Sequence, residues 1–355
     1  MLFRSLLPPE EAPKIFEYRS IFKLATRPPS MPVPGQRFSI GLFEPGSHRV
    51  VEMGSCPLHT PPLKKLIEDL QTELDQSGLV PYDEATRSGD MRYIVARSAH
   101  LTGEILLTFV VTHPLKSVLR QLVVKLQTDY QHRITSAYMN INAGSGNEIM
   151  GDQMERIFGA SGLRERLLDL DFEIGPRSFF QINPWQAQNL YRRVEQLAGR
   201  APKGSVAWDL YSGVGQISLL LGSQGYRVLG VEEIEEAVAD AHQNAIRNRL
   251  DSSVSFVASK VEELDEKLAD WARNPQVVVV NPSRRGLAPQ ARSSLLHLLK
   301  ERPQTRLIYV SCEVETLARD LAELTGSGVL RLRQLEAFDM FPHTSKMEWI
   351  AVLTH

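Results

Sequence analysis

The sequence predicts an α/β fold with a doubly wound parallel sheet, preceded by a domain of α+β type. Strand and helix patterns alternate after residue 175, the strands there are almost continuously apolar, and hairpin-like segments dominate before it. Alternating strands and helices form parallel sheets covered on both faces, whereas locally paired strands with a few helices form α+β domains. We therefore expect two domains in the 355 residues, spanning 1–174 and 175–355.

The carboxyl-terminal domain begins with a helix and continues with five strands separated by helices. Asn183 and Pro184 suit the helix start, because asparagine can cap a first turn and proline is tolerated in it. Two last strands, at about Leu330–Ala337 and Trp349–Thr354, are joined by a loop too short for a parallel crossover, so they should pair antiparallel. This gives a seven-stranded Rossmann-like sheet with an antiparallel last strand. The five preceding strands are expected at Val206–Tyr211, Val228–Val231, Val254–Ala258, Val277–Val280 and Leu307–Ser311.

The amino-terminal half contains strand-rich segments and two amphipathic helices. Met91–Ala99 and Glu104–Thr112 are β-rich runs separated by a short loop. A second glycine-containing turn is flanked by the expected strand segments Ala137–Asn142 and Glu148–Gly151. Apolar residues at helical spacing predict two helices, at Pro62–Leu74 and Leu115–Leu126.

Composition excludes several classes of protein. With 43% hydrophobic and 23% charged residues the chain is globular, and no apolar run approaches the ~18–20 residues that span a bilayer. The formal net charge of −2 argues against nonspecific coating of polyanions, so any nucleic-acid contact must use local patches. Two cysteines, Cys56 and Cys312, are too few for a disulfide framework, a four-cysteine zinc site or an all-cysteine iron–sulfur cluster. We expect a cytoplasmic monomer with free thiols, no metal and no membrane segment.

A glycine-containing loop points to an adenosyl cofactor. The run from Asp209 to Gly215 (DLYSGVG) follows a strand and opens a helix, and Glu232 ends the next strand. In such a sheet the loop lets a ligand approach the backbone, and the acid accepts hydrogen bonds from a ribose diol. Ser218 stands where a dinucleotide-binding loop has its third glycine. S-adenosylmethionine (SAM), which has no pyrophosphate, therefore fits better than NAD, and a tight turn before an ordinary acid is the alternative.

Three other segments should meet at the same edge of the sheet, where ligands bind in such folds. NPSRRG, at 281–286, ends one strand, Cys312 ends the next, and FDMFPHT, at 338–344, precedes Glu348. A lone cysteine is usually a small buried apolar residue, but arginines of NPSRRG at this edge would favour a Cys312 thiolate. Glu348 and Gln181, taken singly, are more often a surface carboxylate and a pre-helix turn residue.

Together these motifs resemble those of the RNA uracil-C5 methyltransferase family, over about residues 178–353. Asn281, where most of the family has aspartate, and the lack of an appended OB-like domain make the 23S rRNA branch the most similar one. The amino-terminal half is more loosely similar to that branch around Tyr18, Cys56 and Arg92. The five motifs are, in order, SFFQINP (178–184), WDLYSGVG (208–215), VNPSRRG (280–286), YVSC-x-x-x-TLARDL (309–321) and FDMFPHT-x-x-x-E (338–348).

The resemblance implies a SAM-dependent enzyme that forms 5-methyluridine. Uracil C5 is too weak a nucleophile to take a methyl group unaided, but a thiolate that adds to C6 gives C5 carbanion character. A base must then remove the C5 proton. By resemblance, Cys312 is the nucleophile and Glu348 the base. Gln181, Tyr211, Glu232 and Asn281 match cofactor-binding positions beside Gly213 of the glycine loop, and Asn281 and Arg285 are candidates for holding the uracil.

The sequence departs from the family pattern beside both expected catalytic residues. Glu313 and Val314 replace a small polar residue and a frequent proline, and Lys346 replaces a histidine. Ser283 replaces a second proline. An acid beside Cys312 would raise the thiol pKa and slow its addition. Relatives often carry a four-cysteine iron–sulfur cluster near the amino terminus, and with two cysteines such a cluster cannot form here.

The amino-terminal domain is expected to bind RNA, with 23S rRNA as the partner. Cations share faces of two strand-like runs, aromatic residues lie nearby for stacking on bases, and the target base would be flipped out to reach Cys312. A solvated sheet face is the alternative for each of these residues. The cations are Arg19, Lys23, Arg92 and Arg97, and the aromatic residues are Tyr18, Phe22 and Tyr93.

Other functions remain open at this point. An amino-methyltransferase would use Asn-Pro-x-x to position an amine, but Arg284 stands where that motif needs an aromatic residue, and Cys312 would have no purpose. A cytosine-C5 enzyme would use a cysteine, although FDMFPHT with Glu348 favours uracil. A tRNA uracil-C5 methyltransferase is a further alternative. A noncatalytic RNA-binding protein with a retained methyltransferase fold is the last one, because of Glu313 and Lys346.

Overall fold

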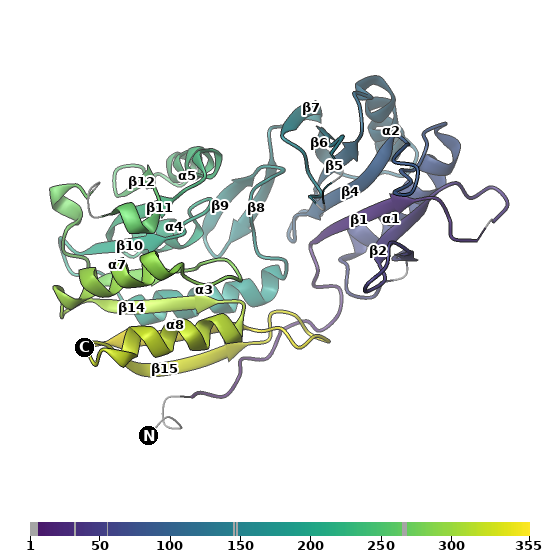
Figure 1. Cartoon of the computed structure of the whole chain (residues 1–355). Coiled ribbons are helices and arrows are strands. Elements are labelled where there is room, and N and C mark those ends of the chain that lie inside the picture. The colour runs from purple at the N-terminus through teal and green to yellow at the C-terminus, as the bar shows by residue number, and fades with distance from the viewer. Residues whose placement is uncertain (1–5, 32, 55, 145, 147, 265–267) are drawn as a thin grey trace. The chain divides into compact units, whose positions relative to one another are not determined.

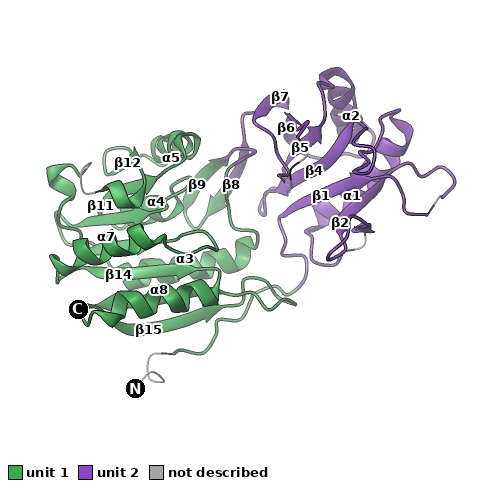
Figure 2. Ribbon diagram, viewed as in Figure 1, with its two compact units in different colours: residues 1–15, 166–173, 178–355 green, residues 16–165, 174–177 purple. Residues whose placement is uncertain are grey.

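The computed structural model describes residues 6–31, 33–54, 56–144, 146, 148–264 and 268–355. The chain forms two compact units, coloured separately in Figure 2. Unit 1 consists of residues 1–15, 166–173 and 178–355, and unit 2 of residues 16–165 and 174–177. In the part of the chain that the structure describes, no helix combines the length and the apolar character needed to cross a bilayer.

Unit 1 is built on a seven-stranded sheet with the strand order β12-β11-β10-β13-β14-β16-β15 (Figure 1). The first five strands in this order run parallel, and β16 pairs antiparallel with both β14 and β15. Each strand lies within one residue of its predicted bounds, so the predicted sheet is confirmed. The strands are β10 (Val206–Leu210), β11 (Arg227–Glu232), β12 (Val254–Ala258), β13 (Val277–Val280), β14 (Arg306–Ser311), β15 (Arg331–Phe338) and β16 (Glu348–Thr354).

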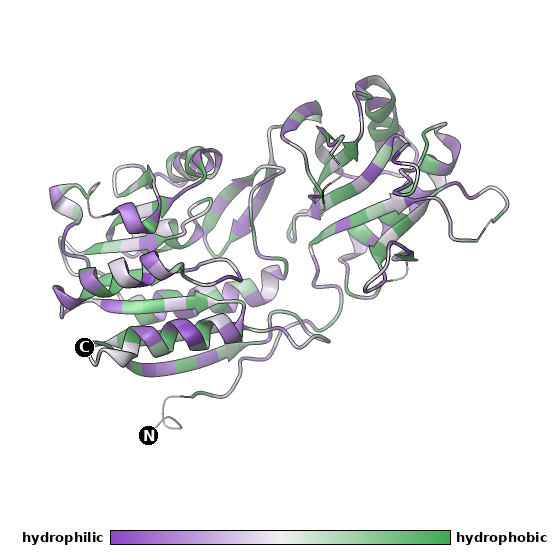
Figure 3. Cartoon of the chain, viewed as in Figure 1, coloured by the Kyte–Doolittle hydropathy of each residue, from purple (hydrophilic) through white to green (hydrophobic). Residues whose placement is uncertain are grey.

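Helices cover both faces of this sheet. α7 and α8 pack apolar side chains against Trp208, Val278 and Tyr309, and Figure 3 shows polar and apolar residues alternating along both helices. The first turn of α3 is capped as predicted, since the Gln186 N–H donates to Asn183 Oδ1 over 3.2 Å. The helices are α3 (Pro184–Ala198), α4 (Gln216–Ser223), α5 (Glu235–Arg247), α7 (Pro289–Lys300) and α8 (Val314–Gly326), with single 3₁₀ turns at Val261–Glu263 and Asp270–Ala272.

The segment 6–15 belongs to unit 1, which differs from the expected division at residues 174 and 175. The Leu7 and Glu10 N–H groups donate to the carbonyls of Leu335 and Ala337 over 2.9 and 2.7 Å. The Gln186 side chain in α3 also donates to the Glu10 carbonyl, over 2.8 Å. These bonds occupy the free edge of β15, and a covered edge is protected from pairing with another chain.

Unit 2 contains a second seven-stranded sheet, in the order β3-β2-β1-β4-β5-β6-β7. All neighbours pair antiparallel except β5 and β6, which are parallel and are joined through α2. The strands are β1 (Ile21–Arg27), β2 (Ser39–Phe43), β3 (Val50–Glu52), β4 (Met91–Ser98), β5 (Ile105–Val111), β6 (Ile134–Ile141) and β7 (Gln153–Gly159), and the helices are α1 (Pro61–Gln76) and α2 (Lys116–Thr128). A separate hairpin is formed by β8 (Leu163–Leu167) and β9 (Leu170–Ile174).

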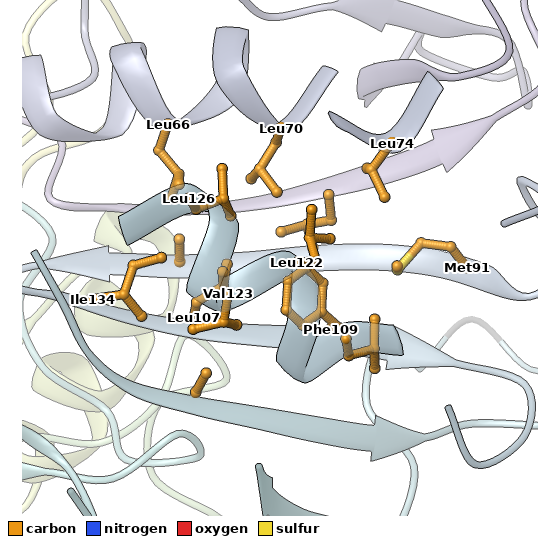
Figure 4. Packing of buried hydrophobic residues seen from close by; sticks show 14 of the residues in the cluster. Leu66, Leu70, Leu74, Met91, Leu107, Phe109, Leu122, Val123, Leu126 and Ile134 are labelled. Carbon is orange, nitrogen blue, oxygen red and sulfur yellow. The ribbon is translucent and has the colours of Figure 1, made fainter. Parts of the chain in front are cut away.

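Both predicted helices of unit 2 cover one face of its sheet. Figure 4 shows Leu66, Leu70 and Leu74 of α1 projecting toward the strands, with Leu122 of α2 beside Phe109 of β5. All five apolar positions that predicted α1 are buried. Burying a leucine side chain stabilises a fold by roughly 1.5–3 kcal/mol, so this layer is the main core of unit 2. The opposite face of β1 and β4 carries a smaller apolar cluster that includes Ala25, Tyr93 and Val95.

Two predictions about unit 2 are wrong. The segment 148–151 is not a strand, and the partner of β6 is β7 instead. The reason lies in two asparagines of β6 and the residue after it. The Asn140 amide donates to the carbonyls of Gly151 and Gln153, and the Asn142 amide donates to that of Glu148, so side chains replace ladder bonds in this loop. Phe22 is also unable to stack on a base, because its ring lies in the core.

Candidate active site

A cavity of about 490 Å³ opens at the carboxyl ends of β10, β11, β13 and β14 in unit 1. It collects side chains from segments that are more than 150 residues apart in the sequence. The structure brings together all seven residues predicted to act as nucleophile, base or cofactor ligands. Those residues are Gln181, Tyr211, Gly213, Glu232, Asn281, Cys312 and Glu348.

The backbone of the glycine loop turns sharply above β10. Gly213 and Gly215 have φ angles of 53° and 89°, and Tyr211, which is not a glycine, has a φ of 66°. A Cβ on Gly215 would lie 2.9 Å from the ring of Phe256, whereas one on Gly213 would meet only the Gln216 side chain at 3.9 Å. Gly215 is therefore required by packing, and Gly213 by its left-handed backbone at the cavity wall.

Glu232 is fixed by the loop that it faces. Its Oε2 accepts a hydrogen bond from the Gly213 N–H over 3.0 Å, and its Oε1 accepts one from the Ile234 N–H over 3.1 Å. Each carboxylate oxygen retains a lone pair for a further donor. The side chain is thus oriented to accept two hydroxyl groups, as binding of a ribose diol requires.

Four buried polar atoms of the cavity wall have no hydrogen-bond partner among the described residues. They are Asp209 Oδ1, Ser212 Oγ, Gln216 Nε2 and Glu348 Oε2. Unpartnered buried polar atoms are costly, so their concentration in one cavity indicates a polar ligand that satisfies them. Burial also raises the pKa of Asp209 to about 7, although the hydrogen bond that Ser218 donates to it over 2.6 Å acts in the opposite direction. Donors and acceptors together suit the zwitterionic amino-acid end of SAM.

Cys312 and Glu348 interact electrostatically across the cavity. Burial raises the pKa of the Cys312 thiol, the Glu348 carboxylate raises it further, and the guanidinium of Arg284 opposes both by charge and by a hydrogen bond. Burial raises the pKa of Glu348 to about 8, although the charge of Arg284 and a hydrogen bond from Gln181 both lower it. A carboxyl group that titrates near neutral pH is well matched to proton abstraction.

Gln181 is held beside the base by the start of α3. The side chain of Gln181 hydrogen-bonds Tyr191 as well as Glu348. Asn183 Nδ2 donates to the Met340 carbonyl over 3.1 Å, which ties the SFFQINP segment to the FDMFPHT segment. The SFFQINP and FDMFPHT segments are therefore hydrogen-bonded to each other beside Glu348. The contact between Gln181 and the base could not be predicted from the sequence.

Two of the four departures from the family pattern, Glu313 and Lys346, form an ion pair. Lys346 Nζ lies 2.6 Å from Glu313 Oε2, and the Glu313 side chain is 18% exposed. The pair joins the loop after Cys312 to the loop before Glu348. Glu313 is not among the groups that raise the thiol pKa, so the penalty expected from an acid at this position is not observed.

Arg284, and not Arg285, lines the cavity that contains Cys312. Both arginines are exposed, and Arg285 lines a neighbouring cavity of about 450 Å³, which shares Tyr211 and Glu232 with the first. The sequence has two adjacent arginines, and only the turn after β13 determines which of them lines the cavity of Cys312. The exposed ring of Phe179, at the first cavity, and Tyr191 were also missed as site residues.

Arg92, predicted to contact substrate, lies in unit 2 and is 1% exposed. Its Nη1 donates to the Asn142 carbonyl and side chain, both over 3.0 Å, and its guanidinium lies 4.6 Å from the centre of the Tyr82 ring. Arg92 therefore holds the loop after β6 within unit 2.

The fold and the cavity define a SAM-dependent methyltransferase that carries a cysteine and a carboxyl group beside the cofactor site. Comparisons with known proteins agree. A family model for tRNA (uracil-5-)-methyltransferase matches residues 89–355. The tRNA (uracil-54, C5)-methyltransferase of Pyrococcus abyssi, solved with S-adenosyl-L-homocysteine, is similar with a TM-score of 0.78 and 29% identity, covering 99% of this chain and 78% of that one.

Curated relatives point the same way. An uncharacterized RNA methyltransferase of Enterococcus faecalis is 33% identical over 314 residues, which cover 88% of this chain and 67% of that protein. One from Geobacter sulfurreducens is 35% identical, and the match covers 88% of this chain and 62% of that protein. The chain thus spans about two thirds of the length of these relatives. It belongs to the RNA uracil-C5 methyltransferase family, whose members use SAM.

Proposed function

We propose that this protein methylates C5 of a uridine in 23S rRNA, with Cys312 as nucleophile and Glu348 as general base. The observation that carries the proposal is that both residues line the cavity of the glycine loop and Glu232. A methyltransferase that modifies an oxygen or an amine has no use for a half-buried cysteine beside a carboxyl group. Uracil C5 requires both groups.

The proposed reaction uses the groups of the cavity in sequence. SAM, when bound, supplies the methyl group, and Glu232, Gly213 and Gln181 would hold it. The Cys312 thiolate adds to C6 of uracil, which breaks the C5–C6 double bond and gives C5 the carbanion character that methylation requires. Once C5 has accepted the methyl group, which leaves S-adenosyl-L-homocysteine, Glu348 would take the C5 proton, the C5–C6 double bond would re-form, and the thiolate would leave.

Arg284 is proposed to support both ionised groups. It opposes the burial that holds the Cys312 thiol and the Glu348 carboxyl in their neutral forms. Asn281 lies in the same wall and has an amide that can hydrogen-bond a uracil edge. Phe179 is 61% exposed at this cavity, so its ring is available to stack on a flipped base.

A tRNA uridine is the second candidate substrate, because the similar Pyrococcus abyssi enzyme is a tRNA (uracil-54, C5)-methyltransferase. The 23S rRNA assignment is supported by Asn281 in place of the more common aspartate. Both substrates need the same chemistry, so the cavity does not discriminate between them, and the choice depends on RNA contacts elsewhere in the protein.

The test is methylation of 23S rRNA and of tRNA, each purified from cells that lack 5-methyluridine, with labelled SAM and nucleoside analysis by mass spectrometry. We expect 5-methyluridine in 23S rRNA, its loss in Cys312→Ala, and retention in the matched variant Cys56→Ala. Labelled tRNA alone would favour the second candidate. A methylated base amine, or RNA binding without any methylation, would contradict uracil-C5 chemistry.

A further inference from the structure

A cavity of about 920 Å³ opens on unit 2, on the face of its sheet that α1 and α2 do not cover. It lies over β1, β2 and β4, and its wall includes Phe43, Tyr82 and Tyr93. Its size is at the upper end of the roughly 300–1,000 Å³ typical of small-molecule sites. No residue of the proposed catalytic site belongs to it.

The floor of this cavity is a buried arginine among aromatic rings. Arg27 is 4% exposed, and its guanidinium carbon lies 5.0, 5.5 and 5.3 Å from the ring centres of Phe43, Tyr82 and Tyr93. Its Nη atoms donate to the carbonyls of Thr26 and Arg92 and to the carboxylate of Glu84. Its Nε has no partner among the described residues, which leaves a buried donor at the cavity floor.

The rim carries two cations that form no ion pair within the described part of the chain. Lys23 and Arg87 are exposed and line the cavity, and neither has a carboxylate partner in the described part of the chain. Partial desolvation and the neighbouring Arg97 lower the pKa of Lys23, as expected where cations lie together. The wall also contains two acids. Glu84 forms an ion pair with Arg27 at 2.6 Å, and Asp83 accepts a hydrogen bond from the Ala85 N–H over 2.8 Å.

We infer that this cavity binds a nucleotide of a single-stranded RNA segment, separate from the methylated uridine. A nucleotide combines a flat ring with an anionic phosphate, and the cavity combines aromatic walls with two free cations and an unpartnered N–H donor. Aromatic side chains stack on bases of any sequence, and cations track the phosphates. A protein segment would use the rings but would not require the cations. The inference rests on the proposed function only in taking RNA as the ligand.

The experiment measures binding of a fluorescein-labelled ten-nucleotide oligouridylate to the full chain by anisotropy, at several salt concentrations. We expect Lys23→Ala and Arg87→Ala each to weaken binding by about tenfold. The plot of the logarithm of the binding constant against the logarithm of the salt concentration should also become less steep, by roughly 0.7 in slope for each lost phosphate contact. Arg120→Ala is the matched control, because Arg120 is an exposed cation on α2, over the other face of the sheet. It should bind like the wild type.

A second measurement does not depend on substitution. Photocrosslinking of the same oligonucleotide containing 4-thiouridine should label peptides with Phe43 or His48, which line the cavity. Unchanged affinity and slope in both cation variants, with crosslinks elsewhere, would overturn the inference. Cys312→Ala separates the two proposals: it should lose methylation while keeping oligonucleotide affinity, whereas the cavity variants should lose affinity with their thiol intact.

Discussion

At the scale of the residue, the most informative side chain is Arg284, because it acts on both proposed catalytic groups. Burial favours the neutral forms of the Cys312 thiol and the Glu348 carboxyl, and the Glu348 carboxylate also raises the pKa of the thiol. A guanidinium that stays protonated at all relevant pH values can offset both effects. The positive charge of Arg284 therefore sets the pH range in which nucleophile and base are available together.

The first prediction concerns the pH dependence of kcat/KM. Because Glu348 has a pKa raised to about 8 and Cys312 a pKa above its ordinary value, both ionised forms increase as pH rises. We expect kcat/KM to rise between about pH 6 and 9, and Arg284→Gln to move that rise to higher pH. Arg285→Gln should change binding without moving the rise. An unshifted profile in Arg284→Gln would show that Arg284 does not act on these groups.

At the scale of the element, the site depends on loops that follow strands of a well-predicted sheet. β14 ends at Ser311, directly before Cys312, and β16 begins with Glu348, so both residues are placed by antiparallel neighbours. The Glu313–Lys346 ion pair connects the two loops on the solvent side. Two of the departures from the family pattern, Glu313 and Lys346, are thus in direct contact.

The second prediction tests this pair. Exposed ion pairs contribute about 0.2–1 kcal/mol; if that contribution acts on the transition state, Glu313→Ala or Lys346→Ala should reduce kcat by about 1.4-fold to fivefold. The exchange Glu313→Lys with Lys346→Glu should recover most of that loss. Lys116→Ala, which breaks the Lys116–Glu155 pair of unit 2, is the control and should leave kcat unchanged. Independent, additive effects of the two single variants would contradict a shared role.

The elements of unit 1 could be predicted because local pattern and tertiary structure agree there. Val277–Val280 is a continuous apolar run that is buried in the centre of the sheet. The loop at 148–151 could not be predicted, since its backbone is bonded by the side chains of Asn140 and Asn142 and not by a strand. Arg284 and Arg285 are equivalent in the sequence, and the direction of each side chain follows only from the turn after β13.

At the scale of the whole molecule, the chain has two units with separate cores. One core lies between the sheet of unit 1 and α7 and α8, and the other lies between the sheet of unit 2 and α1 and α2. The cavity of Cys312 is formed by unit 1 alone, and the aromatic cavity around Arg27 by unit 2 alone. Cofactor binding and the inferred nucleotide binding can therefore be measured separately in the full chain.

The third prediction uses hydrogen exchange in the full chain. S-adenosyl-L-homocysteine should slow exchange of amides at 211–216 and 232–234, because the glycine loop and the Glu232 turn form the cofactor wall. Exchange in β4 and β5 should not change. Glu232→Ala should lose the slowing in unit 1. Slowing confined to unit 2 would place the cofactor elsewhere and contradict the site.

The central claim, that Cys312 attacks uracil, is tested most directly by covalent trapping. In RNA containing 5-fluorouridine, fluorine replaces the hydrogen that the base would remove from C5. The base cannot remove fluorine, so the thiolate cannot be eliminated after methylation. We predict a SAM-dependent adduct that survives denaturation, with the modified nucleotide located on Cys312 by peptide mass spectrometry. Cys56→Ala should form this adduct and Cys312→Ala should not. Bound cofactor and RNA without an adduct, or an adduct on another residue, would contradict the account.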